Sequence, residues 1–189
     1  MTYKRILVPV DGSTTSNAGL REAIRMAQEQ GASLQLVHVA DQHYVAMMGV
    51  ESATAIEDLI AGVTEDGRRI LHNAERVVRK AGLESSAVLL ESLTGPAADL
   101  IVRQAKKWGA DLIVIGTHGR RGVRRLVMGS DAEQIVRTSP VPVLLVRSPE
   151  RARKAAVAAT KQHPKREFRR SSSSSAQCDW PATSAAPHE

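Results

Sequence analysis

The chain has 189 residues, of which 42% are hydrophobic but only 3% aromatic, so it can bury one sizeable core that must be aliphatic. Its formal net charge is +6, and +4 of that lies in residues 148–189, so the basicity is weak evidence that the rest of the chain binds nucleic acid. The single cysteine, Cys178, excludes an intrachain disulfide and a cysteine-based metal site. No run approaches the roughly 20 apolar residues of a membrane span, so we expect a cytoplasmic protein.

The first 40 residues predict a strand, a helix and a second strand. Residues 3–10 form a short, apolar, β-branched run, which is typical of a buried strand. Helix-capping residues follow, and apolar residues then recur at helical spacing up to Gly31, where a glycine would end the helix. The second strand is expected over residues 33–40. His38, inside that strand, is a better candidate for a hydrogen-bonded core or pocket-wall residue than for a metal ligand.

The middle of the chain predicts a long helix and a third strand. Apolar residues at helical spacing from 59 to 78 indicate an amphipathic helix. Gly62 and Gly67 weaken its centre, so a break there is possible. Residues 85–92 are the third expected strand.

Two more helices and two more strands complete the pattern. Pro96 suits the first position of the next helix, and Gly109 closes it. Residues 111–116 are the fourth strand. Ala132, Ile135 and Val136 then mark a helix that cannot continue through a later proline, and residues 141–147 are the fifth strand.

Apolar strands that alternate with helices predict an α/β fold, a single doubly wound, five-stranded parallel sheet with helices on both faces. In such sheets ligands bind outside the carboxyl ends of the strands, where the winding reverses. Two loops are expected at that edge, residues 10–16 after the first strand and residues 116–130 after the fourth.

The second of these loops, "GTHGRRGVRRLVMGS", has features of a phosphate site. Gly116 and Gly119 follow a strand, and Gly129 and Ser130 precede a helix that Ser130 could cap. Phosphates bind where glycines expose backbone N–H groups and where a helix presents its positive end. The sequence contains neither the P-loop motif nor the dinucleotide fingerprint. A plainer alternative is that these glycines serve only turns and a helix cap.

The spacing Gly116-x-x-Gly119, nine residues, then Gly129-Ser130 resembles the ATP-binding motif of the universal stress protein family. The segments "ILVPVDGS", "LVHVA" and "SPVPVLLVR" resemble that family's opening, second and closing strands, and the resemblance spans residues 3–147. It implies a Rossmann-like or flavodoxin-like fold of the adenine nucleotide alpha hydrolase type. It also implies that the chain binds ATP or AMP, with Mg²⁺ possible beside a triphosphate.

The resemblance also implies which residues bind the nucleotide. Pro9, Val10 and Asp11 would lie beside the adenosine, and Val39 would contact adenine through its backbone. The residues expected around the ribose and phosphates are Gly116, Thr117, His118, Gly119, Arg120, Gly129, Ser130 and Asp131. Asp131 could ligate Mg²⁺, although a place in the first helical turn suits it better. No catalytic residue is identified, and any ATP hydrolysis should be slow.

The sequence divides into a domain over residues 1–148 and a basic, Ser-rich tail over residues 149–189, which we expect to be disordered. The resemblance implies a homodimer through the last strand, Val141 to Val146, where Pro142 suits a sheet edge. The first hypothesis is an ATP-binding regulator or sensor of the stress response. The alternative is a dimeric interaction module whose tail contacts a protein or nucleic acid. No membrane contact is expected.

Overall fold

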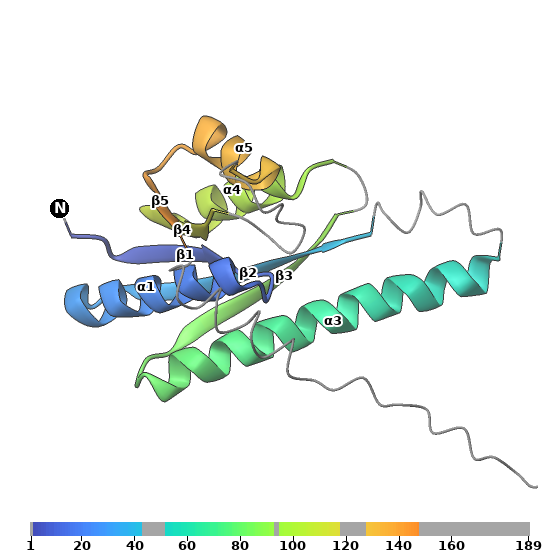
Figure 1. The fold of residues 1–189 in the computed structure, drawn as a ribbon, viewed down its shortest axis with the longest axis horizontal. Helices are drawn as coiled ribbons and strands as arrows, with labels where there is room; N and C mark the ends of the chain where they lie inside the picture. The colour runs from blue at the N-terminus through green and yellow to red at the C-terminus, as the bar shows by residue number, and fades with distance from the viewer. Residues whose placement is uncertain (1, 43–51, 93–94, 118–127, 148–189) are drawn as a thin grey trace, which may run out of the picture.

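The computed structural model describes residues 2–42, 52–92, 95–117 and 128–147. Five parallel strands form one sheet in the order β3-β2-β1-β4-β5. The strands are β1 (Arg5–Pro9), β2 (Ser33–Asp41), β3 (Ser85–Ser92), β4 (Leu112–Gly116) and β5 (Val143–Val146). The helices are α1 (Thr14–Gln30), α3 (Ala53–Lys80), α4 (Ala97–Trp108) and α5 (Ser130–Thr138). The predicted doubly wound α/β fold is confirmed (Figure 1).

The sheet has a separate core on each face. Helices α1 and α3 pack on one face around residues such as Ile6 and Leu36, and α4 and α5 pack on the other around residues such as Leu7 and Ile113. In Figure 1 the first pair lies below the sheet and the second pair above it. The largest fully buried side chains in the described ranges are all isoleucine, leucine or valine, as the composition predicts. Burial of this aliphatic surface on both faces is the main stabilising contribution.

The helix ends follow from local chemistry. Ser13 caps α1, because its side chain accepts a hydrogen bond from the Ser16 N–H. Gly31 and Gly109 end α1 and α4 in the left-handed conformation, with φ of 64° and 69°, as predicted. Helix α4 begins one residue later than predicted, because Pro96 is its N-cap and Ala97 is its first helical residue. No helix in these ranges is long and apolar enough to cross a membrane.

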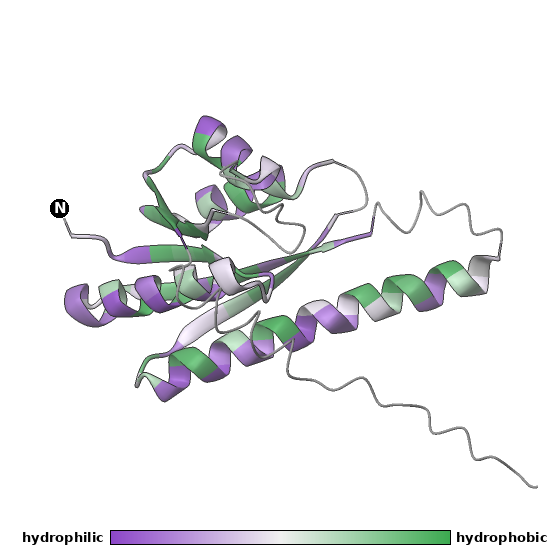
Figure 2. Ribbon diagram, in the orientation of Figure 1, coloured by the Kyte–Doolittle hydropathy of each residue, from purple (hydrophilic) through white to green (hydrophobic). Residues whose placement is uncertain are grey.

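The predicted possible break in the long helix is wrong, because α3 runs unbroken for 28 residues. Figure 2 shows hydrophobic and hydrophilic residues alternating along it. Gly67 is a contact with the sheet: a Cβ there would lie 2.7 Å from Leu89 Cδ1 and 2.8 Å from His38 Cδ2. Gly62, by contrast, has no atom within 4 Å of such a Cβ. Close packing on the sheet therefore explains why residue 67 is a glycine, whereas no such contact exists at Gly62. Both glycines lower the helix propensity of α3 equally.

Alanine at these two positions should have opposite effects. Gly62→Ala is expected to raise the free energy of unfolding by up to about 1 kcal/mol, because it gains only helix propensity. Gly67→Ala is expected to lower it by about 1 kcal/mol, because the clash with His38 and Leu89 outweighs the same gain. Urea unfolding of the full chain measures both. A similar rise in both variants would contradict the close packing at Gly67.

Candidate functional site at the switch between β1 and β4

The winding of the chain reverses between β1 and β4. From β1 the chain continues into α1 on one face of the sheet, and from β4 it continues toward α5 on the other face. The segments that follow these two neighbouring strands therefore diverge at the carboxyl edge of the sheet. Open α/β sheets bind ligands at this position, and the predicted site residues that belong to the described ranges lie around it.

Asp11 leaves the sheet at the end of β1 and is fixed by the start of α1. Val10 makes the last ladder bond, with its N–H 2.8 Å from the Val37 carbonyl. The Asp11 N–H instead lies 3.1 Å from Ser16 Oγ, and its Oδ1 accepts from the Ser13 N–H at 2.9 Å. Asp11 is half-buried. Its carboxylate is thus held at the switch, where it can accept a hydrogen bond from a ligand hydroxyl.

Val39 directs its backbone toward the place where β1 has ended. The register of β1 on β2 ends at Pro9 opposite Val37. Every second residue of a strand turns its N–H and C=O to the same side, so Val39 faces the β1 side as Val37 does, one step past the last pair. This orientation fits the predicted backbone contact with a planar base.

His38 stabilises the same corner. Its Nδ1 donates to the Val10 carbonyl at 2.6 Å, and the residue is 8% exposed. The hydrogen bond fixes the tautomer and ties β2 to the end of β1. The prediction that His38 is a hydrogen-bonded core or pocket-wall residue is therefore confirmed.

Gly116 ends β4 against the backbone of α1. A Cβ at Gly116 would lie 2.6 Å from the Thr15 carbonyl carbon and 2.8 Å from the Ser16 nitrogen. A Cβ at Gly19 would in turn lie 3.3 Å from the Gly116 nitrogen. The glycine at 116 is thus required by close packing of α1 on β4, whether or not a ligand is bound.

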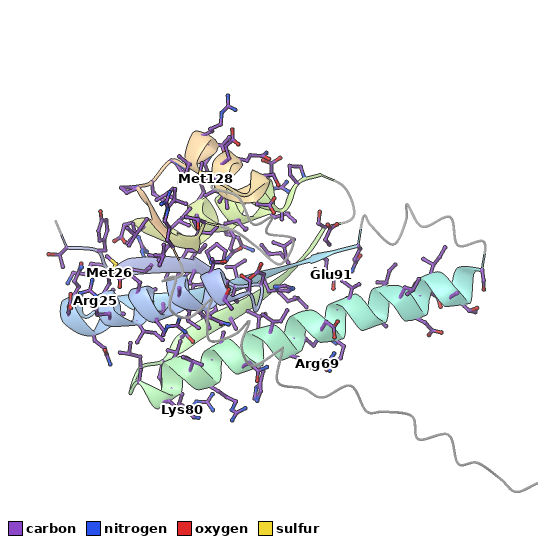
Figure 3. All side chains as sticks on the ribbon, viewed as in Figure 1. Arg25, Met26, Arg69, Lys80, Glu91 and Met128 are labelled. Carbon is purple, nitrogen blue, oxygen red and sulfur yellow. The ribbon has the colours of Figure 1, made fainter. Side chains whose placement is uncertain are left out.

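The two ends of the glycine-rich loop are joined by hydrogen bonds. Thr117 donates to the Val146 carbonyl at 3.0 Å, and Gly129 donates to the Thr117 carbonyl at 3.0 Å. Met128, directly before Gly129, is partly buried against the α4–α5 core (Figure 3). The predicted residues on either side of the loop are therefore brought together, at the edge that also holds Asp11.

The start of α5 differs from the prediction by one residue. Gly129 is the N-cap, with φ of −64° and ψ of 149°, and Ser130 is the first helical residue, so Ser130 does not cap the helix. Gly129 carries no side chain that could satisfy the N–H groups of this nine-residue helix. Asp131 lies in the first turn, where its charge is favourable to the helix dipole. Backbone N–H groups at such an end suit an anion.

Three predicted site residues, His118, Gly119 and Arg120, lie outside the described residues. Within the described ranges no group of three His, Cys, Asp or Glu side chains could hold a metal ion. Ser16, which accepts a hydrogen bond from the Asp11 N–H and so positions that backbone, was not among the predicted site residues. In the sequence, only its position three residues after the cap Ser13 could have indicated Ser16. The contact with Asp11 itself depends on how the turn folds.

Comparison with known proteins gives one consistent result. A model of the universal stress protein family matches residues 2–147. A universal stress protein of Methanocaldococcus jannaschii is 33% identical over 150 residues, covering 79% of this chain and 85% of the relative. A structure from this family from Burkholderia pseudomallei is 31% identical, with a TM-score of 0.61 over 76% of this chain and 95% of that chain. The universal stress protein from Archaeoglobus fulgidus, solved in complex with dAMP, is 28% identical, with a TM-score of 0.54 over 77% and 99%.

Proposed function

The chain belongs to the universal stress protein family, and from this premise we propose that it binds an adenine nucleotide at the switch between β1 and β4. The proposed role is a nucleotide-dependent regulator or sensor of the stress response in the cytoplasm. The observation that carries the proposal is the convergence of Asp11, the Val39 backbone and the Gly129 end of α5 at one edge of the sheet. The dAMP complex of the Archaeoglobus relative supports the ligand class.

Each group at the edge fits one part of a nucleotide. The Val39 N–H and C=O suit the hydrogen-bonding edge of adenine, and the Asp11 carboxylate suits a ribose hydroxyl. The N-terminal N–H groups of α5 suit the phosphates. Arg120, which lies outside the described residues, remains a predicted phosphate contact. We assign ATP as the preferred ligand, with AMP sharing the adenosine contacts. Mg²⁺ would be held mainly by the phosphates, because Asp131 alone offers too few protein ligands.

Gly129 gives the sharpest test, because its backbone does not require glycine. Its φ of −64° is accessible to any residue, so a side chain there would leave the backbone unstrained but occupy space beside the phosphates. Gly129→Val is expected to weaken ATP binding to the full chain at least about tenfold. Isothermal titration calorimetry with ATP and Mg²⁺ measures this change.

The matched control is Gly62→Val on α3, where a Cβ meets no atom within 4 Å. It should leave ATP binding unchanged, and thermal unfolding should show that Gly129→Val remains folded. Absence of any binding heat for the unmodified chain at about 1 mM ATP would refute the proposal. Equal affinity in Gly129→Val and the unmodified chain would place the phosphates elsewhere.

We also propose a homodimer through the β5 edge. β5 lies at the end of the strand order, and its four residues are all half-buried. One side of β5 pairs with β4, so its other side can pair with a second chain. The alternative, an interaction module that acts through residues 149–189, rests on residues outside those described. Deleting residues 150–189 distinguishes it, since loss of partner binding with ATP binding intact would favour that role.

A further inference from the structure

The parallel pairing of β1 with β2 lacks the hydrogen bond that would come next along the two strands. The register ends with Pro9 opposite Val37, and the Val10 N–H donates to the Val37 carbonyl at 2.8 Å. In a parallel ladder the following bond would run from the Val39 N–H to the Val10 carbonyl. That bond is absent within the described ranges. Beyond this point β2 continues beside β3 alone (Figure 1).

A side chain takes the place of the missing backbone donor. His38 Nδ1 lies 2.6 Å from the Val10 carbonyl oxygen. A carbonyl oxygen only accepts, so Nδ1 carries the proton and donates it. The Val10 carbonyl therefore has a hydrogen-bond donor without using the N–H of Val39, which is the next residue after His38 on the same strand.

The imidazole of His38 is held in place from the α3 side of the sheet. His38 lies opposite Leu89 of β3 and is 8% exposed. A Cβ at Gly67 of α3 would lie 2.8 Å from His38 Cδ2 and 3.3 Å from its Nε2. The backbone of α3 therefore approaches the ring closely and closes the space behind it. Packing as well as the hydrogen bond keeps the ring against the Val10 carbonyl.

This arrangement leaves a donor and an acceptor side by side at the end of β1. The N–H and C=O of Val39 both face the side of β2 on which β1 has ended. The Watson–Crick edge of adenine carries the complementary pair, because N1 accepts and the N6 amino group donates. Hypoxanthine carries the reverse pair, since its N1–H donates and its O6 accepts. A Val39 N–H that is not used by the Val10 carbonyl can therefore distinguish the two bases.

We propose that His38 is a positioning residue that makes the site selective for adenine. By occupying the Val10 carbonyl, its imidazole keeps the Val39 N–H available to the base. This inference rests on the proposed function and names a residue that determines the specificity of that site. The Asp11 turn depends less on His38, because the Asp11 N–H and carboxylate are held by groups at the start of α1. The ribose contact should thus survive loss of the imidazole, while the base contact should not.

His38→Leu tests the role of the imidazole. Leucine offers no donor, so the Val10 carbonyl should accept from the Val39 N–H and complete the ladder. Isothermal titration calorimetry of the full chain with AMP and with IMP measures the effect. AMP binding should weaken at least about tenfold, whereas IMP binding should change by less than about threefold. IMP has the same ribose and phosphate as AMP but the reverse hydrogen-bonding edge.

His38→Asn is the conservative variant. Its Nδ2 is attached to Cγ, as Nδ1 of histidine is, and can donate to the same carbonyl. It should retain the unmodified chain's preference for AMP over IMP to within about threefold. The matched control is Gln35→Leu, which removes another buried polar side chain of β2, on the face of the sheet that α4 covers. The control should lower stability but leave the preference for AMP unchanged.

Hydrogen exchange of the Val39 amide tests the same arrangement without a nucleotide. In the ligand-free chain this amide should exchange at least about tenfold more slowly in His38→Leu than in the unmodified protein, because the new ladder bond protects it. Equal exchange rates in the two proteins overturn the inference, as does an equal loss of AMP and IMP affinity in His38→Leu. Loss of the AMP preference in His38→Asn also overturns it. Failure of the proposed function is a different result, because the unmodified chain itself would then bind no adenine nucleotide, and the role of His38 in recognition would be refuted with it.

Discussion

Gly116→Ala is expected to lower the free energy of unfolding by about 3 kcal/mol, the upper end of the range for overpacked positions. The added methyl group would lie 2.6 Å from the Thr15 carbonyl carbon and 2.7 Å from its oxygen. These are backbone atoms at the start of α1, so no side chain can rotate away, and α1 must shift from β4. Equilibrium unfolding in urea measures the loss.

The control is Gly62→Ala, where the same methyl group meets open space. A Gly116→Ala protein as stable as the unmodified chain would show that α1 and β4 are not in this close contact.

The expected loss of stability makes Gly116 a poor position at which to test ATP binding. Weak ATP binding by a Gly116 variant could arise from displacement of α1 and the Asp11 turn, so Gly129 is the better position at which to test for phosphates.

Gln104→Leu is expected to cost about 1–3 kcal/mol of unfolding free energy, because it removes the partner of a buried amide. Gln104 Nε2 of α4 donates to Gln35 Oε1 of β2 at 2.8 Å, and the two residues are 9% and 4% exposed. Gln35 in turn donates to Ser86 Oγ at 3.1 Å. Without Gln104, the buried Gln35 oxygen would face leucine and lose its hydrogen-bond donor.

The double variant Gln35→Leu with Gln104→Leu should lose much less unfolding free energy than the sum of the losses in the two single variants. Apolar side chains in both positions leave neither amide unpaired, and two leucines approximately conserve the volume. Urea unfolding of the four proteins forms a double-mutant cycle. Additive losses would indicate that the pair is not coupled and that each glutamine is satisfied independently.

The place of the candidate site in the fold could be predicted where the signal was local or topological. The switch between β1 and β4 follows from the order of strands and helices, which places residues 10–16 at the carboxyl edge of the sheet beside Gly116. The N-cap of α5 is Gly129 and not the predicted Ser130, which is the first residue of the helix. Serine and glycine both occur at helix caps, so their order in the sequence does not decide which one caps.

The sequence by itself determined the alternation of strands and helices, the two-sided aliphatic core and the glycine ends of α1 and α4. Each of these depends on hydrophobic periodicity or on the conformation of one residue. Only the tertiary structure decided why Gly67 and Gly116 are glycines, why α3 is unbroken and where Gln35 finds its partner. Those properties depend on atoms brought together from distant parts of the chain, such as Gln35 and Gln104, which are 69 positions apart. The local sequence pattern does not predict such contacts, because they form only when the helices pack on the sheet.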